Sequence, residues 1–318
     1  MGDKVLVIGS ANLDVKGRLL GPPIAGSSNA SEIRTSHGGV ARNVAENLAR
    51  LGAPVTLLTA VGDDSVGDDL LRHADEIGID ISRALRVPGE SSGIYLAALD
   101  MTGDLALGLD DLRIVERLSS AYLEANADAF DEADLIVLDM NLEADAFDTA
   151  LRLARIAGKP VCVDPTSDER AARLAPFLAQ IDIITPNMTE AEAILTAIGR
   201  DYPNEHESLT GIQDPDRALQ TARRLVHLGV NMVVVTQAER GACYATEFES
   251  GQLPAVKVRI ADTTGAGDAL TATLVFGLTH DISLSDSVQL GLRAAALTLR
   301  TTATVAPELS LDRLYSDL

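Results

Sequence analysis

The hydrophobic positions along the chain follow two alternating patterns. Short apolar runs, such as KVLVIGS at residues 4–10 and ADLIVLDM at residues 133–140, predict strands that are buried on both faces. Between such runs lie segments with helical spacing that stop at a glycine, such as residues 41–51 before Gly52. The predicted strands are residues 4–10, 54–62, 133–140, 159–164, 181–187 and 231–237, and the predicted helices are residues 41–51, 64–78, 144–158, 168–180, 189–199, 215–229, 266–280 and 284–300.

Strands that alternate with helices of this length indicate an α/β fold. We expect three layers, a mostly parallel sheet with helices on both faces, because crossover helices must cover such a sheet. The whole chain, residues 1–318, is expected to form one domain, with one long polar loop at residues 200–215.

Two segments, at about residues 16–36 and 83–113, break the alternation because neither contains a crossover helix. In the second, SSGIYLAALD and DLALGLD are joined by MTG, which is typical of a β-hairpin. We interpret both as one small antiparallel β lid that covers a site at the edge of the sheet. The alternative is an edge hairpin with no part in function. The exposed edges of such a lid would also let two copies pair as a homodimer.

The charge of the chain excludes some partners. Its formal net charge is −21 and no basic run reverses the sign locally, so nucleic acid is not an expected partner. An anionic substrate would need a local site of backbone N–H groups, a few cations or a metal. The chain enters a strand directly and has no apolar run long enough to span a bilayer, so we expect a cytoplasmic protein without a membrane partner.

The cysteines and histidines do not form a metal or redox motif. Cys162 and Cys243 lie in apolar runs without CxxC spacing, which favours two reduced, buried thiols. The five histidines show neither HExxH nor paired spacing. His37, beside Gly38, is expected to be an exposed loop residue.

Ligands of a mostly parallel sheet bind beyond the carboxyl ends of its strands. Carboxylates are acceptors that suit a diol, and asparagine offers both a donor and an acceptor. The polar residues at the predicted strand ends are therefore the first candidates for a site: Asn12, Asp14, residues 139–143, Asp164, Asn187 and Thr236.

The stretch DTTGAGD, residues 262–268, stands directly before a long apolar helix. Its two glycines would let the N–H groups of the helix N-terminus approach an anion closely. Asp268 would lie beside these groups, where a carboxylate can accept the proton of a hydroxyl that receives a phosphoryl group. A helix-start aspartate is the alternative interpretation. The stretch is not a Walker A loop or a dinucleotide fingerprint, because it lacks the lysine of the first and the third glycine of the second.

Two motifs resemble the signatures of the ribokinase-like (PfkB) family of carbohydrate and nucleoside kinases. HGGVARNVAENLARLG, residues 37–52, is similar to the N-terminal signature, and DTTGAGD is similar to the C-terminal one. The order of strands and helices between them also fits, so the resemblance covers essentially the whole chain. Within the family, residues 38–52, 91–114 and 163–167 look most like those of pseudouridine kinases.

The resemblance implies a phosphotransferase that uses ATP and Mg²⁺ and acts on an alcohol group. The acceptor would be the 5′-hydroxyl of a ribonucleoside, with pseudouridine as the expected substrate and pseudouridine 5′-phosphate as the product. Ribose, adenosine, inosine and fructose-type sugars are rival acceptors. A non-catalytic nucleoside-binding protein on the same fold is a second alternative. A nicotinamide-dependent oxidoreductase is a weaker one, because VIGSANLD replaces GxGxxG after the first strand.

The resemblance also implies roles for individual residues. Asp268 would be the catalytic base, while Gly265, Ala266 and Gly267 would hold the transferring phosphoryl group and contact the nucleotide. The substrate would be bound by Asn12, Asp14, Gly38, Gly39 and Asn43, with Asp111 and Glu143 also expected in the substrate pocket.

The expected metal site lies at the element PNMTE. There Asn187 and Glu190 match the family's Asn-x-x-Glu near Mg²⁺ and the phosphates, and Glu190 would act mostly through water. Thr189 followed by Glu192 is also typical of a helix start, and we expect both interpretations to hold.

Two further loops complete the expected nucleotide site. Thr236 ends a strand where the family places a phosphate contact, and Gly241 follows it. Here TQAERG departs from the family's Thr-x-Gly-x-x-Gly, which weakens the expected contact. Asp262 and Thr264 match positions that bind a monovalent cation, such as K⁺, in some members.

Overall fold

The computed structural model describes residues 3–201 and 217–316, and its core is a large, mostly parallel sheet. Within these residues the main sheet has eight strands in the order β14-β13-β12-β11-β10-β9-β1-β4. The six strands from β4 to β12 are parallel, and β13 and β14 are antiparallel additions at one edge. The strands are β1 (Val5–Ile8), β4 (Val55–Leu58), β9 (Leu135–Asp139), β10 (Val161–Asp164), β11 (Ile183–Ile184), β12 (Met232–Thr236), β13 (Ala242–Thr246) and β14 (Ser250–Leu253).

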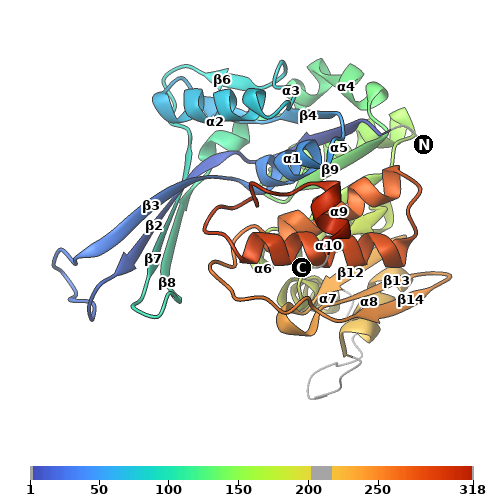
Figure 1. Ribbon diagram of the computed structural model, residues 1–318. Coiled ribbons are helices and arrows are strands. Elements are labelled where there is room, and N and C mark those ends of the chain that lie inside the picture. Colours follow the sequence, from blue (N-terminus) through green and yellow to red (C-terminus); the bar gives the residue numbers. More distant parts are fainter. Residues whose placement is uncertain (1–2, 202–216, 317–318) are drawn as a thin grey trace.

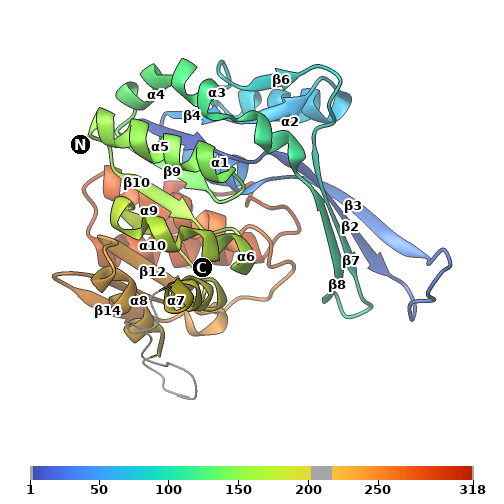
Figure 2. The same cartoon turned by 180° about the vertical axis from the view of Figure 1, so that it is seen from behind.

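Helices cover both faces of this sheet, which gives three layers. On the face toward the viewer in Figure 1 lie α1 (Val40–Leu51), α9 (Ala266–Thr279) and α10 (Leu284–Leu299). The other face, seen in Figure 2, carries α5 (Ala144–Ala157), α6 (Asp168–Ala171), α7 (Met188–Asp201) and α8 (Arg217–His227). The remaining α-helices of the described residues are α2 (Ser65–Glu76), α3 (Ser120–Ala125), α4 (Ala127–Glu132) and α11 (Leu311–Tyr315).

Strand β1, which lies between β9 and β4, shows why the sheet needs both helical layers. Leu6 and Ile8 belong to the apolar cluster shared with α5, α7 and α8, while Val5 and Val7 belong to the cluster shared with α1, α9 and α10. All four side chains are buried, because successive residues of a strand point to opposite faces. The continuous apolar run therefore correctly predicted a strand that is buried on both faces. The predicted α/β fold is confirmed.

The lid is a second sheet that projects from the body (Figure 1). Its strands are β3 (Ser31–Gly38), β2 (Asn12–Leu19), β7 (Gly93–Leu99) and β8 (Leu105–Asp111), in that order across the sheet. The expectation of a purely antiparallel lid is wrong, because the central pair β2 and β7 runs parallel. Each of these two strands leaves the body first in its own insertion, so both run outward and only the returning strands are antiparallel.

Several predicted elements differ in detail. The predicted strand 54–62 is split between β4 and β5 (Ala60–Gly62), which pairs with β6 (Leu85–Val87) in a small sheet of its own. The predicted helix 168–180 changes after Ala171 to a 3₁₀ helix, Ala172–Gln180, which contains Pro176. Proline removes a backbone donor and disfavours a continuous α-helix. Two further 3₁₀ segments are Arg113–Arg117 and Ala238–Arg240.

Other expectations concern the hairpin, the loop and the thiols. The sequence pattern did not predict the hairpin of β13 and β14, whose strands have five and four residues. The predicted polar loop 200–215 lies almost entirely outside the described residues. Cys162 and Cys243 are both buried free thiols, as expected. In the described part of the chain, no helix combines the length and apolar character needed to cross a bilayer.

Candidate active site

The floor of the candidate site is built around Asp139, the last residue of β9. Its carboxylate accepts hydrogen bonds from the Ser10 N–H (2.8 Å), the Ser10 hydroxyl (2.6 Å) and the Ala41 N–H (3.1 Å). A Cβ on Gly9 would lie 2.4 Å from the carboxylate carbon, so only glycine permits this approach. The hydrogen bonds of Asp139 therefore connect β9 with the residues after β1 and with the start of α1.

Asn12 and Asp14 lie together at the base of the lid. Both are buried, and the Asn12 side-chain amide donates to Oδ1 of Asp14 over 2.7 Å. Burial raises the pKa of Asp14, against the lowering effects of Asn12, Lys16 and Arg42. Gly38, the last residue of β3, pairs with Asn12 of β2. A Cβ on Gly38 would lie 2.1 Å from Oδ1 of Asp14. This close approach explains why the first glycine of the HGG sequence, Gly38, has no side chain.

Asp268 lies in the first turn of α9 and is connected to α1. Nδ2 of Asn43 donates to its Oδ2 over 2.6 Å, and Gly39 at the N-cap of α1 has a φ of 95°. Burial raises the pKa of Asp268 well above its ordinary value, Asp164 raises it further, and the hydrogen bond from Asn43 lowers it. The structure thus brings together Asn43 and Asp268, which are far apart in the sequence.

The N-terminus of α9 is open to a ligand. Among the described residues no side chain caps it, and Gly265 at the N-cap has a φ of 82°. A Cβ on Gly265 would lie 1.9 Å from the Thr304 carbonyl oxygen, whereas a Cβ on Gly267 would meet nothing within 4 Å. Free N–H groups at a helix start next to open space suit an anion.

Three buried carboxyl groups lie near this helix start. Burial and the neighbouring Asp139 raise the pKa of Asp164 to about 6, although Thr166 and Thr271 donate to its carboxylate. Burial and Asp164 raise the pKa of Glu190 to about 7. With Asp268, these groups concentrate negative charge that a cation would stabilise.

The chemistry of these groups fits Mg²⁺ bound together with a nucleotide. Within the described ranges, no group of three or more His, Cys, Asp or Glu side chains is arranged to hold a metal ion. Mg²⁺ does not need such a cage, because it keeps several waters and binds one or two carboxylates plus phosphates. Glu190 is the candidate ligand.

Asn187 and Glu190 cap α7. The Asn187 N–H donates to Oε2 of Glu190 over 2.8 Å, and the Glu190 N–H donates to Oδ1 of Asn187 over 2.9 Å. This reciprocal pair is a capping box. The predicted helix start at Thr189 and Glu192 is therefore two residues too late, and Thr189 instead donates to Asp168 and Asn187.

The loop after β12 serves structural contacts. The Thr236 N–H donates to the Pro186 carbonyl over 2.9 Å, next to the bridge between Thr236 and Asn187. Gln237 directly follows Thr236 and precedes the position where the family pattern has its first glycine. Its side-chain amide is buried and contacts Sγ of Cys243 at 3.0 Å. Gly241 has a φ of 94°, and a Cβ there would lie 2.0 Å from the Leu253 carbonyl oxygen, so the β13–β14 hairpin requires it.

Asp262 and Thr264 hold an ammonium group of the protein. Nζ of Lys16, on lid strand β2, lies 2.8 Å from Oδ2 of Asp262 and 2.6 Å from Oγ1 of Thr264. The side chains of Lys16 and Asp262 are 11% and 16% exposed, so this ion pair is largely shielded from water. The lid is thereby joined to the loop that leads into α9.

Asp111 and Glu143 line a cavity of about 540 Å³ together with Asn141. Both carboxylates are exposed; Asp111 pairs with Arg113 at 2.7 Å, and Glu143 is the N-cap residue of α5. Asn141, two residues before Glu143, is the more deeply placed side chain. Its Nδ2 donates to Oγ of Ser10 over 3.0 Å, and its buried Oδ1 has no hydrogen-bond partner in the described part of the chain.

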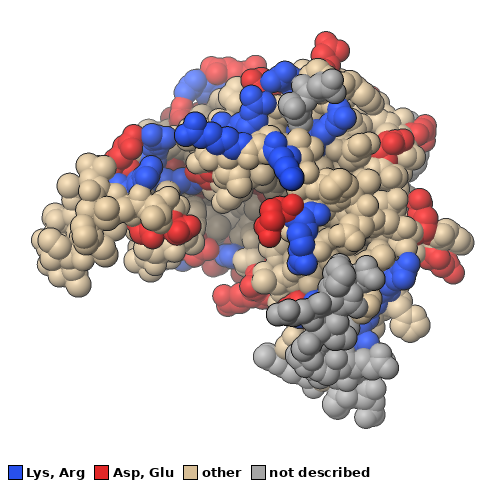
Figure 3. Space-filling view, turned by 60° about the horizontal axis from the view of Figure 1, so that its bottom comes forward, with Lys and Arg blue, Asp and Glu red and all other residues tan. Residues whose placement is uncertain are grey.

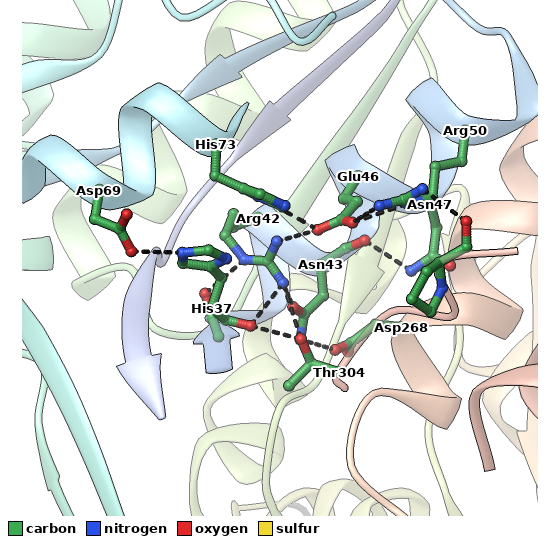
Figure 4. Close-up of polar contacts among 12 residues, drawn as sticks. His37, Arg42, Asn43, Glu46, Asn47, Arg50, Asp69, His73, Asp268 and Thr304 are labelled. Atoms are coloured by element: carbon green, nitrogen blue, oxygen red, sulfur yellow. Dashed lines mark hydrogen bonds and ion pairs between the residues drawn. The ribbon is translucent and has the colours of Figure 1, made fainter. Parts of the chain in front are cut away.

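Sequence reasoning included Asn141 only within the strand-end residues 139–143 and gave it no role of its own. It missed Arg42 and misplaced His37. The signal for Asn141 was its place directly beyond the strand that ends at Asp139. His37 is not an exposed loop residue: it lies in β3 directly before its last residue, its Nε2 lies 2.7 Å from Asp69, and its ring stacks on His73. Arg42 is completely buried between these residues and Asp268 (Figure 4).

The candidate residues form one recess between the lid and the body. In the space-filling view of Figure 3 the lid projects from the body, and the surface is hollowed between the two. Strand ends and helix starts at one edge of the main sheet supply the parts of this recess. These parts are the acceptors at the base of the lid, the uncapped start of α9 and the buried carboxyl groups. This is the edge at which ligands of parallel sheets bind.

The sequence matches a known family over almost its full length. The family described as pfkB family carbohydrate kinase matches residues 3–310. The chain belongs to this family. PfkB members transfer a phosphoryl group to an alcohol, and the resemblance predicted from the two motifs is confirmed.

Individual PfkB relatives differ in what they act on. The chain is 33% identical over 315 residues to a pseudouridine kinase of Escherichia coli strain K12, covering 99% of this chain and 96% of that protein. It is 29% identical over 318 residues to a guanosine-inosine kinase of Exiguobacterium acetylicum, covering 98% and 99%. The solved structure of Arabidopsis thaliana ribokinase with ribose and ATP has a TM-score of 0.81 at 21% identity, with both chains covered completely, and supports the fold.

The two glycines at the start of α9 should respond differently to replacement by alanine. Gly265→Ala should destabilise the protein by at least about 1 kcal/mol, because its positive φ and the contact with Thr304 exclude a Cβ. Gly267→Ala should keep or raise the melting temperature, because alanine favours a helix, yet weaken nucleotide binding, because the methyl group enters the open space. Thermal unfolding and calorimetric titration with MgATP measure both effects. Unchanged nucleotide affinity in Gly267→Ala would exclude this space as the phosphate site.

The ammonium of Lys16 should make turnover independent of K⁺. We expect equal rates in choline chloride and in KCl for the unchanged protein, because Lys16 already neutralises Asp262. Lys16→Met should lower the rate and make it respond to K⁺, since it leaves a shielded carboxylate unpaired. Lys4→Met is the control, because Lys4 pairs with the exposed Glu132 instead. K⁺ activation of the unchanged protein would contradict this expectation.

Proposed function

We propose that this protein transfers the γ-phosphoryl group of ATP to the 5′-hydroxyl of a ribonucleoside, with pseudouridine as the substrate. The observation that carries the proposal is the joint placement of a buried carboxylate, Asp268, and an uncapped helix start. An acceptor oxygen between them would meet a proton acceptor on one side and the anion-binding N–H groups on the other.

The ribose of the acceptor would be held at the base of the lid. Asp14 presents a carboxylate acceptor and Asn12 and Asn43 present amides, and this combination suits the vicinal hydroxyls of a ribose. Gly38 and Gly39 keep this surface free of side chains. The open cavity beside Asn141 leaves room beyond the sugar for a base, with the unpartnered Oδ1 of Asn141 as an acceptor for a ring N–H.

The chemical step follows from these positions. The 5′-hydroxyl gives its proton to Asp268, its oxygen forms the bond to the γ-phosphorus, and the bond to the bridging oxygen breaks to release ADP. Gly265, Ala266 and Gly267 stabilise the charge of the transferring group through their N–H groups. Bound Mg²⁺ would neutralise the phosphates, and Glu190 would hold it, mostly through water. Asn187 and Thr236 would contact the phosphates, and Gly241 would support their loop.

Pseudouridine is favoured over the rival acceptors by the relatives. The E. coli pseudouridine kinase is more similar to this chain than the guanosine-inosine kinase is, and both are covered almost completely. The guanosine-inosine kinase makes a purine nucleoside the second candidate. Both acceptors share the ribose that Asp14 and Asn43 would bind, so the mechanism is the same for either.

A coupled ADP-release assay with MgATP tests the function and the substrate. We expect turnover with pseudouridine well above turnover with uridine, guanosine, inosine, adenosine, ribose and fructose. Asp268→Asn should lower turnover by about 10²–10⁴-fold, the usual contribution of a general base. A preference for another acceptor would agree with the proposed mechanism but would contradict pseudouridine as the substrate. Tight nucleoside binding without turnover would favour the non-catalytic alternative.

Asp286→Asn is the matched control for this experiment. Asp286 also lies in the first turn of an apolar helix, α10, where it pairs with the Ser283 hydroxyl at 2.7 Å. If Asp268 were only a helix-start residue, both replacements would leave turnover intact.

We also propose that two copies pair through the outer face of the lid. Ile33, Leu96, Leu107 and Leu109 are at least 40% exposed, and strand pairing places them in two adjacent rows on one face. Asp14 and Lys16 point from the opposite face, toward the body. A second copy is the favoured occupant because the formal charge of −21 opposes contact elsewhere, while these two rows contain no charged side chain.

The molar mass in solution tests this pairing. Light scattering should give a dimer, and the double replacement of Leu107 and Leu109 by glutamate should give a monomer, because it places charge in the apolar face. Ile156→Glu is the control, since Ile156 is 70% exposed on α5 in the body. A monomeric unchanged protein would contradict the proposal.

A further inference from the structure

Arg42 is a charged side chain that is 1% exposed. It lies between α9 and residues 37–39, which we call the substrate turn because Gly38 and Gly39 are expected to bind the acceptor. A buried guanidinium is costly unless each donor has a partner and its charge is balanced. Here each of the three guanidinium nitrogens has at least one partner (Figure 4). The partners are the Gly38 carbonyl (2.9 Å), the His37 carbonyl (2.9 Å), the Thr304 hydroxyl (3.1 Å), the Glu46 carboxylate and Oδ1 of Asn43.

Glu46 balances the charge of Arg42. It lies one turn later on α1 and is shared by a second arginine, Arg50, at 2.7 Å. Burial would raise the pKa of Glu46, but the two arginines outweigh it and lower the pKa below its ordinary value. Glu46 is therefore a carboxylate, and Arg42 is held in one position from both ends.

The contact with Asn43 has a directional consequence. A guanidinium can only donate hydrogen bonds, so the atom of Asn43 that faces Arg42 must be the amide oxygen. The amide nitrogen then points the other way, toward Oδ2 of Asp268 at 2.6 Å. Arg42 thus determines that the nitrogen, and not the oxygen, of the Asn43 amide faces Asp268.

This orientation matters because Asp268 is surrounded by groups that oppose its ionisation. Burial raises its pKa, and so do Asp164 on β10 and Asp139 on β9, while Asn43 and Arg42 on α1 lower it. A flipped amide would present an oxygen to the carboxylate instead of a donor. Asp268 would then lose a hydrogen bond that favours the charged form.

Arg42 also connects the two loops on either side of the base. The Thr304 hydroxyl accepts from Arg42 and donates to the His37 carbonyl over 2.5 Å. The carbonyl of the same Thr304 fills the space beside Gly265 that a Cβ would need. The guanidinium is therefore linked to the substrate turn and to the start of α9 at once.

We propose that Arg42 is a positioning residue for the phosphoryl transfer: it fixes the Asn43 amide so that Asn43 donates to Asp268, the base. This inference rests on the proposed function of Asp268 and adds a residue to it. Arg42 itself touches neither acceptor nor nucleotide. The competing explanation is that Arg42 only anchors α1 through Glu46, and Arg50 shares that anchoring.

Arg50→Met is therefore the matched control for Arg42→Met. Both remove a guanidinium from Glu46, but Arg50 makes its other hydrogen bond to the Pro307 carbonyl and has no contact with Asn43. Arg42→Met should lower kcat by about 10²-fold, the scale of a misplaced catalytic group, with the acceptor KM nearly unchanged. Arg50→Met should leave kcat unchanged. Equal losses in both variants would overturn the proposal.

A double replacement tests whether Arg42 acts through Asn43. In an Asn43→Ala background the change Arg42→Met should have little further effect on kcat, because residues that act through one another are not additive. Fully additive losses would overturn the proposal. If Arg42→Met does not fold, Arg42→Lys keeps a charge beside Glu46 but cannot reach Asn43 and Thr304 together, and the same kcat loss is expected of it.

The pH profile separates orientation from packing. The acid limb of kcat/KM reports ionisation of Asp268, and protonated Asp268 cannot accept the hydroxyl proton. Loss of the donor raises the pKa of Asp268 further, so the limb should move to higher pH in Arg42→Met. It should stay in place in Arg50→Met, where Asn43 keeps its orientation.

Magnetic resonance of the Asn43 side chain decides the geometry without any turnover. With ¹⁵N-labelled asparagine, and Asn43→Ser to assign the signal, the Asn43 amide should shift as Asp268 ionises. The shift should persist in Arg50→Met and disappear in Arg42→Met. If no acceptor is phosphorylated, the proposed function fails while this measurement still stands. A titration unchanged in Arg42→Met would overturn the role of Arg42.

Discussion

The arrangement of this site depends on one constraint, the burial of several carboxyl groups at the same edge of the sheet. Asp139, Asp164, Glu190 and Asp268 come from four elements, and Asp164 raises the pKa of both Glu190 and Asp268. The fold resolves this differently for each group. Asp139 is satisfied by N–H and hydroxyl donors, Asp164 by Thr166 and Thr271, and Glu190 by the backbone at the start of α7. Asp268 receives one donor, from Asn43, and faces the open recess. Its remaining capacity to accept is what a base requires.

The same constraint explains the glycines around the site. Gly9, Gly38 and Gly265 each stand where a Cβ would overlap an oxygen atom of a carboxylate or a carbonyl. Removing the side chain lets two acceptor-bearing segments approach closely without an intervening methyl group. The motifs HGG and GAGD are thus packing requirements as well as features of a ligand site, and sequence alone does not separate the two causes.

The layered fold could be predicted because its signals are local. Apolar runs and helical spacing are properties of neighbouring residues, and they correctly located β1, β9, β10 and the long helices. The parallel pairing of β2 with β7 and the capping of α7 by Asn187 depend on geometry that the pattern does not contain. The motif residues Asp268, Asn43 and Asp14 could be named in advance because they resemble known signatures. Arg42 and Lys16 could not, because their meaning lies in partners such as Thr304 and Asp262, which only the folded chain brings near.

The bond from Arg42 to Thr304 joins residues that are 262 positions apart. The site therefore needs segments that are far apart in the sequence, since residues 37–43 are synthesised long before Thr304, which supports them. Contacts of such long range are costly to close and form late in folding. A ribosome-bound chain that ends before α9 could contain β1, β4 and the lid strands. It would still lack Asp268 and the Thr304 carbonyl that lies beside Gly265. The site is therefore complete only when α9 and Thr304 are packed against α1.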